Sequence, residues 1–192
     1  AATGENDGTF DTVTARTILV ENYAGVIVVG LPADEAGAGL VKTNSAKGKE
    51  LVRLTSTPAG GGVVTFPRNG RELVALSSTD GGGSVTTYRP NGKKLVQLSS
   101  TVDGEGTVVT FQPNGKALVN LTATSSGKGL VKTYQSNGKT LVELGANDNG
   151  GLVGVYNNTG EGIAKMFADE YDNGLLCVYN RKGEGRTLKP GP

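Results

Sequence analysis

The sequence predicts an all-β protein made of tandem repeats of 22 or 23 residues, each holding two short strands. A turn motif built around Asn-Gly or a close variant returns at this spacing along most of the chain. Aliphatic and β-branched residues fill the runs between the turns, and no window has the period of an amphipathic helix. Self-similarity at a fixed period is the signature of repeat architectures, whose units stack to bury a shared core.

The repeat is defined by the glycine of its turn, and aliphatic residues follow that glycine at fixed offsets. The turn glycines are Gly25, Gly48, Gly70, Gly92, Gly115, Gly138, Gly160 and Gly183. Three residues after each of the five central glycines stands a leucine: Leu51, Leu73, Leu95, Leu118 and Leu141. A valine comes next and a second leucine two residues later, as in Val96 and Leu98. An aromatic residue usually lies four residues before the glycine, so each unit predicts strand, turn and strand.

The segment from Arg89 to Lys93 predicts a tight hairpin turn. Pro90 suits the second position of a type I turn because its φ is fixed, and Asn91 suits the third position. Gly92 then adopts the left-handed conformation that closes a three-residue hairpin with a bulge. The same interpretation applies to two later turns, which contain the pairs Asn114 with Gly115 and Asn137 with Gly138.

This turn predicts a strand register, and the register predicts two faces. Tyr88 faces Lys94, Thr87 faces Leu95, Thr86 faces Val96 and Val85 faces Gln97. Because side chains alternate along a strand, one face would carry Tyr88, Val96 and Leu98, and the other Val85, Thr87, Leu95, Gln97 and Lys93. Both faces then hold aliphatic residues. A repeated leucine ladder exposed on a monomer would form a large apolar stripe, so we expect other copies of the chain to cover it.

Three architectures fit this pattern. The one that we favour is a homo-oligomeric β-prism or intertwined β-helix, an elongated stack that we expect to be a homotrimer. A monomeric solenoid is the first alternative, although a hairpin turn suits a solenoid corner badly. A closed barrel or a propeller is the second, although propeller blades need about 40 to 45 residues. We expect a lead-in strand and cap over residues 1–24, a repetitive domain over 25–159, and a divergent repeat with a C-terminal cap over 160–192.

The pattern G-x-V-x-x-Y-x-x-N-G-K-x-L-V-x-L, read from Gly83 to Leu98, resembles short-repeat β proteins of bacteria and the shafts of phage tail fibres. The resemblance covers about residues 20 to 185. It implies a trimeric, elongated and structural protein located outside the cell, at a cell surface or in a virion. No functional residues are carried over by this resemblance.

Composition gives no support to several classes of function. Among 192 residues there are 19 Lys and Arg against 18 Asp and Glu, so no charge excess favours nucleic acid or a membrane surface. No apolar run approaches the length of about 18 residues typical of a membrane helix. The chain has no histidine, the usual general base and metal ligand, so we expect no enzyme, no cofactor and no metal site. The single cysteine, Cys177, lies in an apolar run and is interpreted as a buried core residue.

Several polar patterns have both a structural and a functional interpretation. The acidic segment of Asp169, Glu170, Tyr171 and Asp172 follows Phe167 in what we expect to be a longer loop, the first place to seek a specific partner. Single aspartates in the Gly-rich loops suggest calcium, but each loop offers about one acid. A threonine ladder and a basic ladder recur beside the turns: Thr43, Thr65, Thr87, Thr110 and Thr133, and Lys49, Arg71, Lys93, Lys116 and Lys139. We interpret the first as cross-strand pairing and the second as solubilising charge.

The sequence therefore predicts a non-catalytic structural or adhesive protein, a shaft or stalk that assembles with copies of itself as a homotrimer. The alternative is a module whose repetitive surface binds a polysaccharide or ice. A glycan is accordingly the one partner expected besides the chain itself, without nucleic acid and without membrane insertion.

Overall fold

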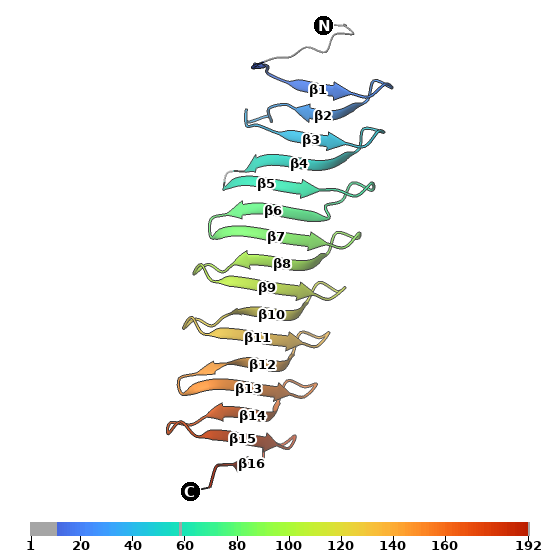
Figure 1. The fold of residues 1–192 in the computed structure, drawn as a ribbon. Coiled ribbons are helices and arrows are strands. Elements are labelled where there is room, and N and C mark those ends of the chain that lie inside the picture. Colours follow the sequence, from blue (N-terminus) through green and yellow to red (C-terminus); the bar gives the residue numbers. More distant parts are fainter. Residues whose placement is uncertain (1–10, 58, 192) are drawn as a thin grey trace.

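The computed structural model describes residues 11–57 and 59–191 and shows a single antiparallel sheet of sixteen strands (Figure 1). The strands are β1 Ile18–Glu21, β2 Ile27–Leu31, β3 Val41–Asn44, β4 Glu50–Thr57, β5 Gly60–Thr65, β6 Val74–Thr79, β7 Gly82–Tyr88, β8 Lys94–Ser100, β9 Gly106–Phe111, β10 Ala117–Ala123, β11 Gly129–Tyr134, β12 Thr140–Asn147, β13 Gly150–Tyr156, β14 Gly162–Ala168, β15 Gly174–Tyr179 and β16 Gly185–Leu188. Each strand pairs with its neighbours in the sequence, from β1 at one edge to β16 at the other. The all-β prediction is confirmed. No helix in the described residues is long and apolar enough to cross a membrane.

The turns that the sequence singled out close the hairpins on one side of the sheet. In the turn between β7 and β8, the N–H of Gly92 donates to Arg89 O over 2.8 Å, and the N–H of Arg89 donates to Lys93 O over 2.8 Å. Gly92 has a φ of 83°, in the left-handed region that L side chains avoid. Asn91 accepts the N–H of Lys93 through its side-chain oxygen. The equivalent glycines at 115 and 138 have φ values of 90° and 92°.

The register within these hairpins differs from the expected one. Tyr88 does face Lys94, but Thr87 then pairs with Val96, and Leu95 has no partner in β7. A β-bulge at Leu95 inserts one extra residue into β8. A slip of one residue exchanges the faces of the side chains beyond it, so the predicted grouping of Tyr88 with Val96 and Leu98 is wrong.

The corrected register separates the residue types more cleanly than the predicted one. Val85 lies opposite Leu98 and Thr87 opposite Val96, so these four side chains share one face. Gln97 lies opposite Thr86, on the other face with Tyr88. The same shift recurs in the hairpins formed by β3 with β4, β9 with β10, β11 with β12, and β13 with β14. The bulge is therefore a regular part of the repeat.

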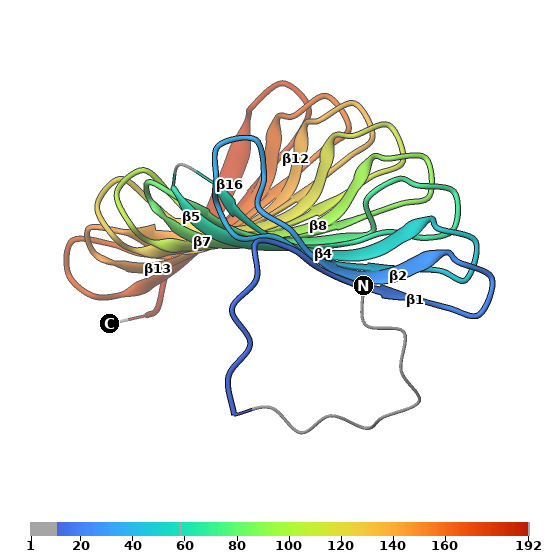
Figure 2. The ribbon, with the colours of Figure 1, turned by 90° about the horizontal axis from the view of Figure 1, so that it is seen from above.

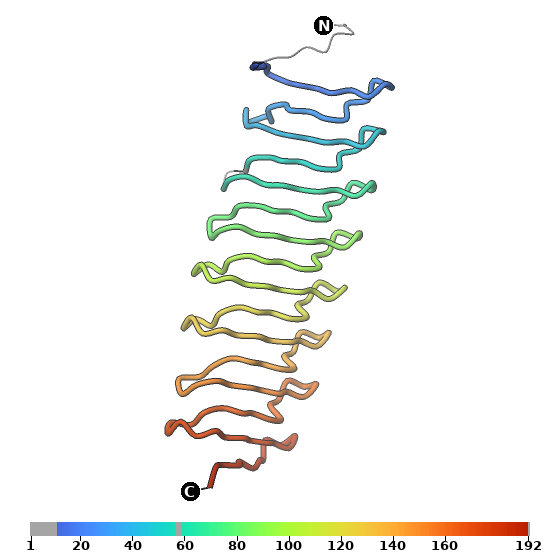
Figure 3. The backbone as a smooth tube through the Cα atoms, viewed as in Figure 1, coloured from blue at the N-terminus to red at the C-terminus, as the bar shows by residue number. Residues whose placement is uncertain are grey.

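The sheet is one layer thick and twists along its length. Viewed from above, the strands fan out progressively from β1 to β16 (Figure 2), as the right-handed twist of strands requires. The backbone trace shows the chain zigzagging between two parallel rows of turns (Figure 3). Consecutive strands are antiparallel neighbours, so the described chain does not wind through the parallel coils of a solenoid.

A single layer leaves the chain without an interior. Its accessible surface is 13082 Å², whereas a globular monomer of this mass would expose about 8,600 Å². Among the described residues, Cys177 is the one apolar side chain that is buried, with 4% of its surface exposed. The fold is thus held by backbone ladders and side-chain contacts within the layer, and both faces are open.

The C-terminal region continues the same sheet. The turn between β14 and β15 spans residues 169–173, as short as the turns over 101–105 and 124–128, so the expectation of a longer loop there is wrong. The loop departs from the others in its acidic residues and in Asp172, which has a φ of 62°. The sheet runs without interruption from Ile18 to Leu188 and so includes parts of all three segments expected from the sequence. Residues 1–10 of the expected N-terminal cap and residue 192 lie outside the described residues.

Candidate interaction surfaces

One face of the sheet, here called the aliphatic face, consists of two continuous rows of side chains that run across the strands. The first row contains only aliphatic side chains and methionine: Val41, Leu54, Val63, Leu76, Val85, Leu98, Val108, Leu121, Val131, Leu144, Val153, Met166, Leu176 and Leu188. The second alternates threonine with valine in its central part: Thr43, Val52, Thr65, Val74, Thr87, Val96, Thr110, Val119, Thr133 and Val142. Each member lies directly opposite the next across a strand pair.

The leucines of the first row are half exposed. Leu54, Leu98 and Leu144 expose 44%, 44% and 45% of their surface, and Met166 exposes 54%. Two shallow hollows lie over this row, one beside Leu76 and one beside Met166. Exposed apolar rows of this length are uncommon on monomeric proteins and are typical of surfaces that associate with a partner.

The opposite face, here called the polar face, carries charged and aromatic side chains that contact one another. Glu50 forms salt bridges with Lys42 and Arg53, at 3.7 and 2.7 Å, and Lys132 forms one with Glu143 at 3.4 Å. Pairs of this kind at a half-exposed surface contribute little to stability, so they indicate which face is compatible with water.

An aromatic row follows the turn side of the polar face. Its members are Phe66, Tyr88, Phe111, Tyr134, Tyr156 and Tyr179, all half buried. Two of them lie under cations, with Arg53 at 5.2 Å from the ring centre of Phe66 and Lys94 at 5.9 Å from that of Phe111. Burial raises the pKa of the Tyr156 hydroxyl, and the nearby Glu143 carboxylate raises it further.

The threonine ladder has a local role in the bulges. Thr87 Oγ1 accepts the N–H of Val96 over 3.2 Å, and Thr110 Oγ1 accepts the N–H of Val119 over the same distance. These N–H groups follow the unpaired bulge residue, where the backbone ladder is disrupted. The hydroxyls of these two threonines therefore form hydrogen bonds within the sheet. This explains why threonine stands at these positions, which cross-strand pairing alone did not explain.

The basic ladder joins successive turns. In five of the turns, the cation that follows the turn glycine donates to a carbonyl oxygen in the next turn on the same side of the sheet. These bonds link Lys49 to Arg68, Arg71 to Asn91, Lys93 to Pro113, Lys116 to Asn137 and Lys139 to Thr159. The first four measure 3.2, 2.7, 3.0 and 2.8 Å. The expectation that these residues serve as solubilising charge missed this contact, because it depends on the spacing between turns.

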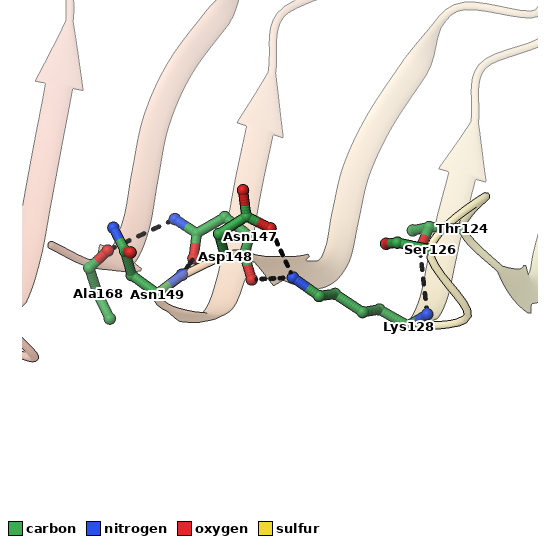
Figure 4. Close-up of polar contacts among 7 residues, drawn as sticks. All are labelled: Thr124, Ser126, Lys128, Asn147, Asp148, Asn149 and Ala168. Carbon is green, nitrogen blue, oxygen red and sulfur yellow. Dashed lines mark hydrogen bonds and ion pairs between the residues drawn. The ribbon is translucent and has the colours of Figure 1, made fainter. Parts of the chain in front are cut away.

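The turns on the other side of the sheet are joined in a similar way (Figure 4). Lys128 donates to Asn147 O over 2.6 Å and approaches Asp148 Oδ1 at 3.0 Å. Asn147 in turn donates to Ala168 O over 3.4 Å. Three successive turns are therefore linked through two side chains.

The acidic loop predicted to meet a partner is used for turn formation. Asp169 Oδ1 accepts the N–H groups of Tyr171 and Asn173, each over 2.9 Å. The bond from Asn173 lowers the pKa of the Asp169 carboxyl. Tyr171 is 75% exposed at the tip. No group of three or more potential metal ligands forms in the described parts of the chain.

The predicted leucine ladder lies at the bulges. Leu51, Leu95, Leu118 and Leu141 are each skipped by the pairing with the preceding strand, and Leu73 precedes β6. Val96 and Leu98, by contrast, are regular members of the aliphatic face.

No protein-family model matches the sequence, and no curated protein is significantly similar to it. Among solved structures, the chain is similar to a protein of unknown function from Bacteroides caccae. The two share 15% identity over 91% of this chain and 69% of that one, with a TM-score of 0.19. A likeness at this score supports no statement about fold or function, so we infer function from the geometry of the chain itself.

Proposed function

We propose that this chain is a non-catalytic structural or adhesive protein that assembles with copies of itself into a homotrimeric shaft. One observation carries the proposal: the aliphatic face runs the length of a single-layer sheet with nothing in the described chain to cover it. Two-stranded units of this size cannot bury a core alone. Other copies of the chain offer the same apolar rows at the same spacing.

Simple geometry favours three chains. The longer central strands have six to eight residues, which corresponds to a width of about 20 to 27 Å. Three sheets of the smaller width, arranged as a triangular prism, would each lie about 6 Å from the axis, near half the roughly 10 Å that separates packed sheets. Four sheets would leave a hollow. Three sheets whose aliphatic faces point inward would therefore form a filled β-prism.

The proposal also accounts for the polar face. In a prism, the ion pairs and the aromatic row of that face would point outward to water. A long, stiff rod with a polar exterior suits a stalk at a cell surface or in a virion, the extracellular setting implied by the resemblance to bacterial and phage fibre proteins.

The mass in solution tests the proposal. Sedimentation equilibrium should give three times the 19.6 kDa of one chain at micromolar concentration. A monomer under these conditions would overturn the proposal. A stable dimer would contradict the trimer and would indicate two sheets packed through their aliphatic faces.

The aromatic row favours a second candidate, a module that binds an extended polysaccharide. Aromatic side chains recur at every second strand, about 9.6 Å apart, and sugar rings stack on aromatic faces. Polar neighbours such as Gln97 and Asn120 lie on the same face and offer hydrogen bonds. A glycan array with the wild-type chain and a Tyr88→Ala, Tyr134→Ala variant tests this candidate. Equal signals from both proteins, or no signal from either, would exclude it.

A further inference from the structure

The two rows of turns carry opposite charge. The turns that follow odd-numbered strands, on the right of Figure 1, form what we call the basic edge. They contain ten basic residues, Lys47, Lys49, Arg68, Arg71, Arg89, Lys93, Lys116, Lys139, Arg181 and Lys182, against three acidic ones, Glu72, Glu161 and Glu184. The turns that follow even-numbered strands form the acidic edge. They contain nine acidic residues, Asp34, Glu35, Asp80, Asp103, Glu105, Asp148, Asp169, Glu170 and Asp172, against one basic residue, Lys128.

This separation is hidden in the overall composition. The chain as a whole has a net charge of +1, because the excess of one edge cancels that of the other. A strand of seven residues such as β8 spans about 23 Å, which exceeds the distance over which exposed charges attract in physiological salt. The two edges of one chain therefore do not neutralise each other.

Within each edge, most of the charges form no salt bridge. In the described chain, the salt bridges involve Lys42, Arg53 and Lys132 on the polar face, and on the acidic edge Lys128 with Asp148. None of these salt bridges includes a residue of the basic edge. Like charges follow one another at about 9.6 Å along each edge, an arrangement that costs free energy unless opposite charge lies nearby.

The orientation of neighbouring copies decides which edges meet. A copy rotated about the stacking axis keeps its strands running in the same order and brings its acidic edge to the basic edge of its neighbour. A copy related by a two-fold axis along the strands, or perpendicular to the sheet, reverses the stack and brings like edges together. Complementary potentials suppress the wrong arrangement and set the register of an interface.

We propose that, in the assembled protein, the basic edge of each copy contacts the acidic edge of the next copy, with all copies parallel about the stacking axis. This inference rests on the proposed self-assembly and specifies the second surface through which it occurs. The aliphatic face provides the buried area of the interface. The two edges determine the relative orientation of neighbouring copies and their alignment along the stacking axis. Turns at similar heights would meet, such as the β7–β8 turn with Lys93 and the β8–β9 turn with Asp103.

A carbodiimide, which joins an amine to a carboxylate without a spacer, tests the contact on the assembled wild-type protein. Because the strands that separate the two edges of one chain span about 13 to 27 Å, beyond the reach of a cross-link without a spacer, any basic-edge to acidic-edge product must link two chains. Mass spectrometry should identify Lys93 or Lys116 joined to Asp103 or Glu105. A trimer that yields no product between unlike edges would overturn this inference and leave the proposed function standing. A monomeric mass would overturn both.

Charge reversal provides the second measurement. The variant Asp80→Lys, Asp103→Lys should raise the concentration at which the assembly dissociates by about tenfold or more at low salt. Adding Arg68→Glu and Lys93→Glu to this variant should return the dissociation concentration to within about threefold of the wild-type value, because edges of opposite charge again meet. The control Lys165→Glu reverses a charge on the polar face, outside both edges, and should have no effect. Equal dissociation for all three variants and wild type would contradict the contact. Circular dichroism confirms that each variant keeps its strands.

Discussion

Replacing three leucines in the centre of the aliphatic face should dissociate the assembly. We choose Leu76→Thr, Leu98→Thr and Leu121→Thr, because threonine preserves β-propensity while it removes apolar surface. These leucines are 43%, 44% and 50% exposed in the single chain. Burying a whole leucine contributes about 1.5–3 kcal/mol, so covering the remaining half contributes roughly 0.7–1.5 kcal/mol each. The three together are worth about 2–4 kcal/mol per chain.

This loss corresponds to a weakening of association by about 30- to 1,000-fold per chain, since each 1.4 kcal/mol is a factor of about ten. Sedimentation velocity across a concentration series measures the shift. The matched control replaces three aliphatic residues of the polar face, Val64→Thr, Val109→Thr and Leu130→Thr. Val64 lies opposite Arg53, and Val109 lies opposite Gln97.

The control should assemble like the wild type, because its residues are not in the proposed interface. If both triple variants dissociate equally, the loss reflects general destabilisation of the sheet, and the assignment of the aliphatic face to the interface fails. If neither dissociates, the copies associate through another surface.

Three further predictions concern the single chain. Gly92→Ala should lower the free energy of unfolding by about 1–2 kcal/mol, because φ at Gly92 is 83°, while Gly83→Ala, which meets nothing within 4 Å, should change it little; equal melting temperatures would contradict the left-handed turn. Thr87→Val should cost about 0.5–1.5 kcal/mol by removing the acceptor for the Val96 N–H, and Thr87→Ser should recover part of that in chemical denaturation. The Asp169 carboxyl should titrate below 3.8 by NMR, because the N–H of Asn173 lowers its pKa. Its contribution to stability is present above the unfolded pKa and is lost as the pH falls through the folded value; a midpoint at or above 3.8 would contradict the bond.

The fold class could be predicted because the repeat places turn residues at a constant spacing. Pro90, Asn91 and Gly92 have conformational preferences that do not depend on the rest of the chain. The same preferences predicted the first pairs of the hairpin, and these pairs are present. Local chemistry thus determined the turns and the alternation of strands.

The residues on each face could not be predicted, because the bulge at Leu95 requires no particular type of residue. Leu95 is as suitable for a regular strand position as for a bulge, and the slip becomes visible only when Thr87 pairs with Val96. A clue was available in the pattern itself, since the observed register unites Val85 with Leu98 and separates both from Gln97. Requiring one uniformly apolar face, as antiparallel sheets prefer, would have favoured a bulge.

The charged edges were likewise present in the sequence but divided among turns. Lys93 and Asp103 are ten residues apart and look like members of one mixed-charge surface. In a meander, turns that follow odd-numbered strands lie on one side of the sheet and turns that follow even-numbered strands lie on the other. The position of a turn in the strand order therefore determines the edge to which its charges belong. The linear sequence supports this sorting only after the meander topology is known, because a solenoid or a barrel would arrange the same loops differently.

The bonds between successive turns make the length of this protein adjustable. Each reaches only to the next turn on its own side, as from Lys116 to Asn137, and no strand depends on one far away in the sequence. Deleting or duplicating one repeat of 22 or 23 residues would bring equivalent positions together, so the pattern of strand pairing and of bonds between turns would be preserved. The sheet would shorten or lengthen by two strand spacings, about 9.6 Å, with its width and surface chemistry unchanged. The number of repeats in the chain therefore sets the length of the sheet along its stacking axis.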